Sequence, residues 1–259
     1  MTRDAAVKDQ RTHLVVLCCH AVYHGTHGRD PRKEENWALK PFQRGTDTKA
    51  GEHETFLQHA FAAVQLRNER SLVVFSGGPT DDAYPDLSEA RSYLNAFEHW
   101  ADAIGYAPSR DVLDGIALEE AATDSYQNVL FSILVFRRRT GHYPTSMTII
   151  THAFKNDRFL RLHAKALKWP ADRVKVLGIN PPFTIAELES TEAGEKRNGF
   201  GPWETDLYGT ASVLSSKRKA RGWKEGKNSE LAEGLEPVVQ RLLLYQGREQ
   251  VFPETLPWE

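Results

Sequence analysis

The sequence predicts a single α/β domain: a doubly wound, mostly parallel sheet of about five strands, with helices on both faces and a C-terminal helical cap. Three observations predict this fold. Short apolar runs such as LVVLCC and SLVVFS recur along the chain, as expected for strands buried on both faces. Segments of roughly 12 to 20 residues with helical spacing separate the runs, which is typical of β-α-β units. Glycine-containing turns follow the first two runs.

The apolar runs and helical periodicities place the elements in order. Strands are expected at 14–19, 72–76, 111–113, 146–151 and 173–178. Helices are expected at 54–69, 87–104, 119–139, 155–168, 206–220 and 229–246. The stretch 28–52 is long and irregular, and its aromatic residues indicate a functional loop. We expect residues 1–259 to form one domain, with a core at about 12–180 and a cap at about 181–259.

The composition is ordinary for a globular protein with a sizeable core. Of 259 residues, 40% are hydrophobic and 26% are charged, and the net charge is −2. This charge gives no overall attraction to nucleic acid or to an anionic membrane. No apolar run approaches the roughly 20 residues of a membrane helix, and the polar N-terminus is unlike a secretory signal. With only two adjacent cysteines, Cys18 and Cys19, we expect a cytoplasmic protein without membrane or nucleic-acid partners.

The strand expected at 72–76 ends in the turn Ser76-Gly77-Gly78, at the sheet edge where open α/β folds bind ligands. Glycines permit a sharp turn and a close ligand approach. Backbone N–H groups in such a turn can bind a phosphate or a carboxylate. The turn lacks the Lys-Ser/Thr of a P-loop and the third glycine of the dinucleotide motif. It therefore predicts an anion site without ATPase or standard NAD chemistry, and a tight structural turn is the alternative.

Polar residues begin the two helices that follow. Ser88 and Glu89 suit a helix N-terminus, while Glu89 could also bind a ribose or another hydroxyl. Asp124 and Asn128, with Ser125 between them, are four residues apart and share a helix face. We expect this group either to orient a ligand hydroxyl or a water, or to cap the helix as a solvated acidic turn.

The run THAFKNDR leaves the fourth strand and enters a helix. Lys155 and Arg158 lie three residues apart near the positive end of that helix, where an anion would offset the unfavourable dipole. They therefore predict an anion site, and a salt bridge to an acidic residue is the alternative. His152, at the strand end, is placed to act as a general acid or base, or as a hydrogen-bonded structural histidine.

Two further patterns carry weaker signals. His20, His24 and His27 have a spacing that suits zinc on a helix, but the intervening Gly25 disfavours a helix, so no metal site is expected. His20 alone, at the end of the first strand, remains a candidate pocket residue. The basic run from 217 to 227 has only one interleaved aromatic and predicts a solvated helix face.

In order and spacing, the motifs resemble the ElyC/SanA/YdcF family, known as domain of unknown function 218, and especially its fungal-type members. The matching pieces are Cys19-His20-Ala21, Trp37 to Gln43, Phe56 to His59, Phe75-Ser76-Gly77-Gly78, Ser88 to Tyr93, Asp124-Ser125 with Asn128, Phe154 to Phe159, Trp203 to Gly209, and Lys217-Arg218. The resemblance implies a Rossmann-like fold with a pocket at the carboxyl ends of the strands. It also implies nucleotide-like ligands such as S-adenosylmethionine. Lys155 stands where bacterial members tend to have histidine, and the family has no generally established reaction.

We therefore expect a hydrolase or group transferase that acts on a small anionic substrate, phosphorylated or nucleotide-like. Gly77, Gly78, Lys155 and Arg158 would bind the anion, while His20, Glu89, Asp124, Asn128 and His152 would orient groups or transfer protons. No cofactor is required by the sequence. The alternative is a non-catalytic module that binds a nucleotide or S-adenosylmethionine in the same pocket.

Overall fold

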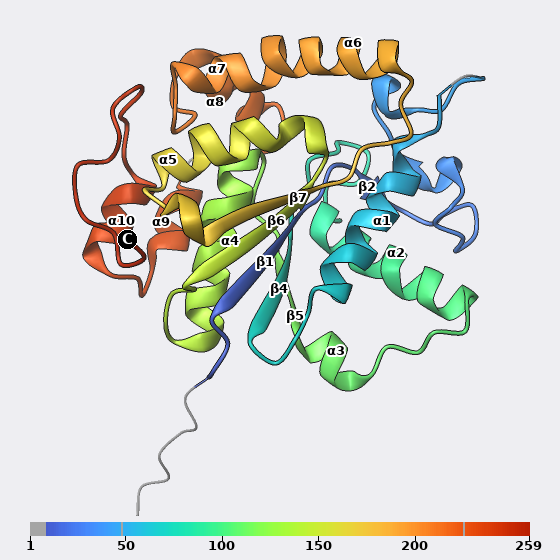
Figure 1. The fold of residues 1–259 in the computed structure, drawn as a ribbon, viewed down its shortest axis with the longest axis horizontal. Coiled ribbons are helices and arrows are strands. Elements are labelled where there is room, and N and C mark those ends of the chain that lie inside the picture. Colours follow the sequence, from blue (N-terminus) through green and yellow to red (C-terminus); the bar gives the residue numbers. More distant parts are fainter. Residues whose placement is uncertain (1–8, 48, 225) are drawn as a thin grey trace, which may run out of the picture.

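Five strands form one parallel sheet in the computed structural model, which describes residues 9–47, 49–224 and 226–259 (Figure 1). The strands are β1 (His13–Cys18), β4 (Ser71–Ser76), β5 (Ile116–Glu119), β6 (Ser146–Thr151) and β7 (Val174–Gly178). Their order is β5-β4-β1-β6-β7, and every neighbouring pair is parallel. The chain builds outward from β1 first on one side and then on the other, which is the doubly wound, Rossmann-like arrangement. The predicted fold class is confirmed.

Helices bury both faces of the sheet (Figure 1). The face toward α1 (Glu52–Gln65) and α2 (Glu89–Ala103) contains Val15 and Leu17 of β1. The face toward α4 (Ser125–Thr140) contains Leu14 and Val16 of the same strand. Because side chains alternate along a strand, burial on both faces requires an unbroken apolar run. This is why the strands were recognisable in the sequence.

The C-terminal part adds a helical cap. Its helices are α6 (Ile185–Glu195), α7 (Gly201–Glu204), α8 (Ser212–Lys219), α9 (Lys227–Ala232) and α10 (Pro237–Leu243), with a π-helical segment, Lys196–Phe200, between α6 and α7. Helices α6 to α8 lie beyond the carboxyl ends of the strands, while α9 and α10 lie beside α4 (Figure 1). Near the C-terminus, the indole N–H of Trp258 donates to the Leu167 carbonyl at 2.7 Å. The cap thus packs on the core, and α6 to α8 cover the carboxyl ends of the strands.

Short elements fill the loop at 28–52. A two-stranded antiparallel hairpin joins β2 (Val22–Tyr23) to β3 (Trp37–Ala38), and 3₁₀ turns occupy Glu34–Asn36 and Pro41–Gln43. Trp37 is buried and donates its indole N–H to the Pro31 carbonyl at 2.7 Å. The loop is therefore packed against the α1–α2 side of the core.

The strand expected at 111–113 is wrong. These residues belong to the short helix α3 (Arg110–Asp114), and the strand is β5, a few residues later. The Ser109 hydroxyl accepts a hydrogen bond from the Val112 N–H and caps α3, which stabilises a helix over an isolated apolar triplet. Because Glu119 ends β5, the helix expected at 119–139 begins only at Ser125.

The other helical boundaries also differ from expectation. The segment expected as one helix at 155–168 is a 3₁₀ turn (Ala153–Lys155), a π-helical segment (Arg158–His163) and α5 (Ala164–Ala166). A further 3₁₀ turn, Ala171–Arg173, precedes β7. The helix expected at 229–246 is divided into α9 and α10, and α6 was missed. Thr184 and Glu187 form a capping box at the start of α6, which is a signal readable in the sequence. No helix within the described residues is long and apolar enough to cross a membrane.

Truncation of the core should be costly on the α1 face. Phe56 is fully buried and packs near Trp37 and Tyr93, at ring-centroid distances of 5.8 and 5.9 Å. We expect Phe56→Ala to lower the free energy of unfolding by about 3–5 kcal/mol in urea titrations, because it leaves a cavity. Ile185→Ala, at a side chain that is 80% exposed, is the control and should change it by less than about 0.5 kcal/mol. Equal losses in both variants would contradict this assignment of the core.

Candidate functional site

A cavity of about 920 Å³ opens at the carboxyl edge of the sheet. Its floor includes Cys18, Cys19 and His20 at the end of β1, and its roof includes residues of α6 and α8. The loop after β3 and the beginning of α4 form further walls. The volume is typical of a small-molecule site, and the position is where open α/β sheets bind ligands.

Lys155 lies in this cavity without an acidic partner. No carboxylate oxygen of a described residue lies within 4.0 Å of its Nζ, whose recorded polar neighbour is His20 Nδ1 at 3.4 Å. Burial, and then the charge of Arg158, lowers the pKa of Lys155 to about 8. Lys155 is partly exposed to the cavity, so its ammonium group has lost part of its hydration, and the more distant charges of Glu195 and Glu52 offset this loss only in part.

His20 lines the cavity beside Lys155. Since the lysine donates to Nδ1, the proton of a neutral His20 lies on Nε2, which is 3.2 Å from Thr151 Oγ1. Burial, and then the charge of Lys155, holds the pKa of His20 well below its usual value. The imidazole is therefore a neutral base whose Nδ1 lone pair points toward the lysine.

Three more cations surround Lys155 in the cavity. Arg158 lies 3.0 Å from a Glu195 oxygen, so the salt bridge that the sequence left open is present. Arg158 Nε and Glu195 Oε1 are not aligned for a hydrogen bond. The Arg158 guanidinium donates no hydrogen bond to any described residue. Lys217 and Arg221 also line the cavity, where they donate to the carbonyls of Asn198 and Thr123 at 2.8 and 2.9 Å. Part of the basic run predicted to be a solvated face is thus turned toward the site.

Glu89 supplies a carboxyl group to the cavity at the start of α2. One of its oxygens accepts a hydrogen bond from the Thr80 hydroxyl. Burial raises the pKa of Glu89. Gly77 permits this position, because a Cβ there would lie only 2.7 Å from Glu89 Oε2.

The glycine turn itself does not offer its amides to a ligand. The N–H groups of Gly77 and Gly78 donate to the carbonyls of Glu119 and Ala122 at 3.0 and 2.7 Å. The Ser76 hydroxyl donates to Glu119 at 2.6 Å, below the cavity floor. None of the three residues lines the cavity, so the predicted anion cradle at this turn is wrong and the structural alternative applies.

Two of the predicted polar residues serve mainly as helix caps. Ser88 accepts from the Arg91 N–H at 2.9 Å at the start of α2 and does not line the cavity. Asp124 accepts from the Gln127 N–H at 2.9 Å at the start of α4 and also forms an ion pair with Arg218. Asp124 lines the cavity, but its charge is already paired.

Ser125 and Asn128 line the cavity as expected. The Ser125 hydroxyl is hydrogen bonded to His163 Nε2 at 2.7 Å, and Asn128 Oδ1 lies 3.2 Å from the Ser76 hydroxyl. Both side chains therefore connect the cavity wall to groups beneath it. They are placed to orient a ligand rather than to react with it.

His152 is buried beneath the site and does not line the cavity. It stacks between His20 and Phe154, at ring-centroid distances of 4.7 and 4.9 Å. Burial holds its pKa well below the usual value, so it is neutral. His152 therefore does not reach the cavity, which fits the alternative of a structural histidine, and His20 lines the cavity.

The other histidines of the first loop lie apart from His20. His24 stacks on Tyr84 at 4.7 Å and pairs edge-to-face with His27 at 6.1 Å. Within the described residues, no group of three or more histidine, cysteine, aspartate or glutamate side chains is arranged to bind a metal ion. The spacing of the three histidines in the sequence does not become a cluster in space.

Glu119 is a buried acidic residue at the end of β5. The sequence analysis placed it at the start of the helix expected at 119–139. Its Oε1 accepts from the N–H groups of Ala121 and Ala122 at 2.7 and 3.0 Å, while Oε2 accepts from Ser76. Burial nevertheless raises the pKa of Glu119 to about 7. Glu119 therefore supports the loop between β5 and α4, on which Asp124 and Ser125 depend.

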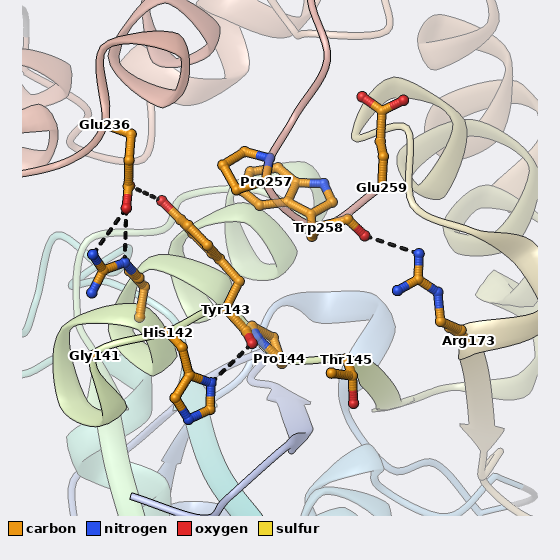
Figure 2. A pocket seen from close by; sticks show the side chains of 11 residues that line it. Gly141, His142, Tyr143, Pro144, Thr145, Arg173, Glu236, Pro257, Trp258 and Glu259 are labelled. Carbon is orange, nitrogen blue, oxygen red and sulfur yellow. Dashed lines mark hydrogen bonds and ion pairs between the residues drawn. The ribbon is translucent and has the colours of Figure 1, made fainter. Parts of the chain in front are cut away.

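A second cavity, of about 390 Å³, lies at the opposite edge of the sheet, where β6 and β7 begin (Figure 2). Its charged groups contact one another or the backbone. Arg137 pairs with Glu236 at 2.9 Å, the Tyr143 hydroxyl donates to Glu236, and Arg173 donates to the Trp258 carbonyl at 3.0 Å (Figure 2). These contacts attach the C-terminal segment to the core, so the carboxyl-edge cavity is the candidate site.

Comparison with known proteins gives a distant homologue. The uncharacterized protein YOR238W of Saccharomyces cerevisiae is 27% identical over 263 residues, a match that covers 82% of this chain and 84% of the yeast protein. No protein-family model matches the chain. No solved structure matches it.

The titration of Glu119 should be visible in protein stability. Its folded pKa of about 7 lies above the ordinary 4.5, so between these values the unfolded state binds fewer protons and stability falls as pH rises. We expect the unfolding free energy of the parent, relative to Glu119→Gln, to decline by about 2–3 kcal/mol between pH 4.5 and 7 and then to level off. Urea titrations across this range measure the difference. Glu233→Gln, at an exposed site, is the control, and identical profiles for all three proteins would refute the assignment.

Proposed function

We propose that this chain is an enzyme, a hydrolase or group transferase, that acts on a small phosphorylated, nucleotide-like substrate in the carboxyl-edge cavity. The observation that carries the proposal is Lys155, a cation enclosed in a cavity of ligand size without a carboxylate partner among the described residues. The sequence predicted an anion site at this position, and the geometry is consistent with one.

The physical argument rests on the cost of burying charge. A buried cation is unfavourable unless it is paired, and proteins normally place a carboxylate beside it. Here Arg158 repels Lys155 and His20 is neutral, while Glu195 and Glu52 attract the lysine only from beyond ion-pair distance. A phosphoryl oxygen between Lys155 and Arg158 would supply the missing negative charge and accept hydrogen bonds from both. Ligand binding would thus relieve an electrostatic conflict present in the protein alone.

Two groups in the cavity suit proton transfer. Neutral His20 directs its Nδ1 lone pair at Lys155, so it would serve as a general base once a ligand draws the lysine away. Glu89, whose pKa is raised by burial, fits a general acid that protonates a leaving group. Phe154 and Phe183 add an apolar wall, at a ring-centroid distance of 6.3 Å, against which a nucleobase could pack. Asn128 and Ser125 would orient the remaining polar groups.

We also propose that the chain is a member of the ElyC/SanA/YdcF family. The parallel sheet, its strand order and the cavity at the carboxyl edge agree with the fold that the resemblance implies. Residues of several matching motifs line that cavity, among them His20, Asp124, Asn128, Lys155 and Arg158. Motifs far apart in the sequence thus meet at one site.

A non-catalytic binding module is the second candidate. Two of the four predicted catalytic residues are engaged elsewhere, since Asp124 pairs with Arg218 and His152 lies below the cavity floor. The same cavity would then bind a nucleotide or S-adenosylmethionine without turnover. The two candidates differ in whether any ligand is consumed.

Anion affinity should depend on the charge of Lys155. The lysine is cationic below its pKa of about 8 and neutral above it. We therefore expect the affinity for a phosphorylated ligand to fall by up to tenfold per pH unit above about pH 8, measured by isothermal titration calorimetry. In Lys155→Arg the slope should flatten, since arginine stays charged, and in Lys155→Met binding should be lost. Equal affinity in the parent and Lys155→Met would refute the anion role of this residue.

Turnover should depend on Glu89. With a panel of nucleotides and sugar phosphates, product formation measured by mass spectrometry should be about 10²- to 10⁴-fold slower in Glu89→Gln, with little change in KM. Glu192→Gln, on the exposed side of α6, should retain the parent rate. A full rate in Glu89→Gln would remove it as the general acid. Binding without any turnover in the parent would favour the binding module.

A further inference from the structure

Four of the cations that line the cavity form two pairs that come from different parts of the chain. Lys155 and Arg158 follow β6, next to His20 and Glu195. Lys217, in α8, and Arg221, just after α8, come from the C-terminal cap. The second pair is fixed to other parts of the wall, because Lys217 donates to the Asn198 carbonyl and Arg221 to the Thr123 carbonyl.

The four cations of these two pairs largely lack carboxylate partners. The other cations of the cavity wall are Lys40 and Lys49, which pair with Asp81 and Glu52, and Arg44. Of the four cations, only Arg158 has a carboxylate oxygen of a described residue within 4.0 Å. Burial, and then the charges of Arg221 and Arg158, lowers the pKa of Lys217, which shows that these groups are close enough to repel one another. By contrast, Arg218 on the same helix is paired with Asp124. Asp124 thus neutralises Arg218, whereas no carboxylate oxygen of a described residue lies within 4.0 Å of the charged groups of Lys217 and Arg221.

A single phosphate group does not match this arrangement. A phosphate monoester carries a charge of at most about −2 near neutral pH, whereas three of the four cations have no carboxylate partner. A diphosphate group carries more charge and spans a greater length, so one phosphoryl group can contact each pair. Donors that approach phosphate from two sides act together, which makes the second contact effectively intramolecular.

We propose that Lys217 and Arg221 form a second anion subsite, so that the cavity prefers ligands with two linked phosphoryl groups, such as a nucleoside diphosphate, over monophosphates. The inference rests on the proposed function, because the first phosphoryl group occupies the subsite of Lys155 and Arg158. It assigns a role to a basic segment that, from sequence alone, was expected to be a solvated surface.

The test compares one and two phosphoryl groups in the same protein. Affinities of the parent for inorganic phosphate, pyrophosphate, AMP and ADP are measured by calorimetry at constant ionic strength. We expect pyrophosphate to bind at least tenfold more tightly than phosphate, and ADP at least tenfold more tightly than AMP. Agreement of the two comparisons shows that the preference comes from the diphosphate and not from the nucleoside.

The variant Lys217→Met/Arg221→Met should remove this preference selectively. Its affinities for phosphate and AMP should stay within about twofold of the parent, while those for pyrophosphate and ADP fall to the same level. Lys165→Met/Lys224→Met is the matched control, since it removes two exposed charges outside the cavity and should keep the preference. Unchanged melting temperatures show that both variants fold.

The possible failures are distinguishable. If the parent binds phosphate and pyrophosphate equally, the second subsite is refuted and the proposed function stands. If Lys217→Met/Arg221→Met weakens all four ligands equally, the two pairs form one site and the inference is also refuted. If the parent binds none of the four ligands, both the inference and the proposed phosphorylated substrate are refuted.

Discussion

The parallel register of β1 is the constraint on which the rest of the structure depends. This strand pairs with β4 on one side and β6 on the other, and all three run in the same direction. The polar residues that follow them must therefore leave the sheet at one edge, where His20 and Lys155 lie near each other. Neither could occupy the interior of the sheet, because both faces are covered by helices and buried polar groups need partners. The cavity is the place where the covering layers stop and the cap begins.

Electrostatics separates the structural ion pairs from the groups available to a ligand. Arg218 and Asp124 satisfy each other and fix α8 to the start of α4. Arg137 and Glu236 play a similar part at the opposite edge of the sheet (Figure 2). Lys155 differs, because burial and the charge of Arg158 lower its pKa and the charges of Glu195 and Glu52 only partly offset them. Conflicts of this kind are expected at functional sites, where a ligand supplies the group that the protein lacks. The buried carboxyl groups Glu89 and Glu119 show the same separation, since Glu119 accepts three hydrogen bonds from the protein whereas Glu89 faces the cavity.

Local sequence signals predicted residues that line the cavity in some cases and misled in others. Lys155 was recognised because a lysine at the start of a predicted helix conflicts with the helix dipole, and it lines the cavity. His152 was chosen because it directly follows β6. The position of a residue after a strand does not fix the direction of its side chain, and that of His152 is buried below the cavity floor. Gly77 and Gly78 suggested an amide cradle, yet their N–H groups satisfy carbonyls of the neighbouring loop. The helix α3 was mistaken for a strand because a segment as short as Asp111 to Leu113 does not distinguish the two structures without the cap from Ser109.

By itself, the sequence determined the sheet, its five strands with one of them misplaced, and the edge at which a site would form. These features follow from side-chain periodicity and from the burial of strands on two faces, which are properties of consecutive residues. Only the tertiary structure decided which charged groups meet. Lys217 is about 60 residues from Lys155 along the chain, and no local pattern predicts that the cap turns Lys217 and Arg221 toward the cavity while Asp124 neutralises Arg218 between them. The physical reason is that charge interactions depend on distance in space and on burial, and both are set when the cap packs over the sheet.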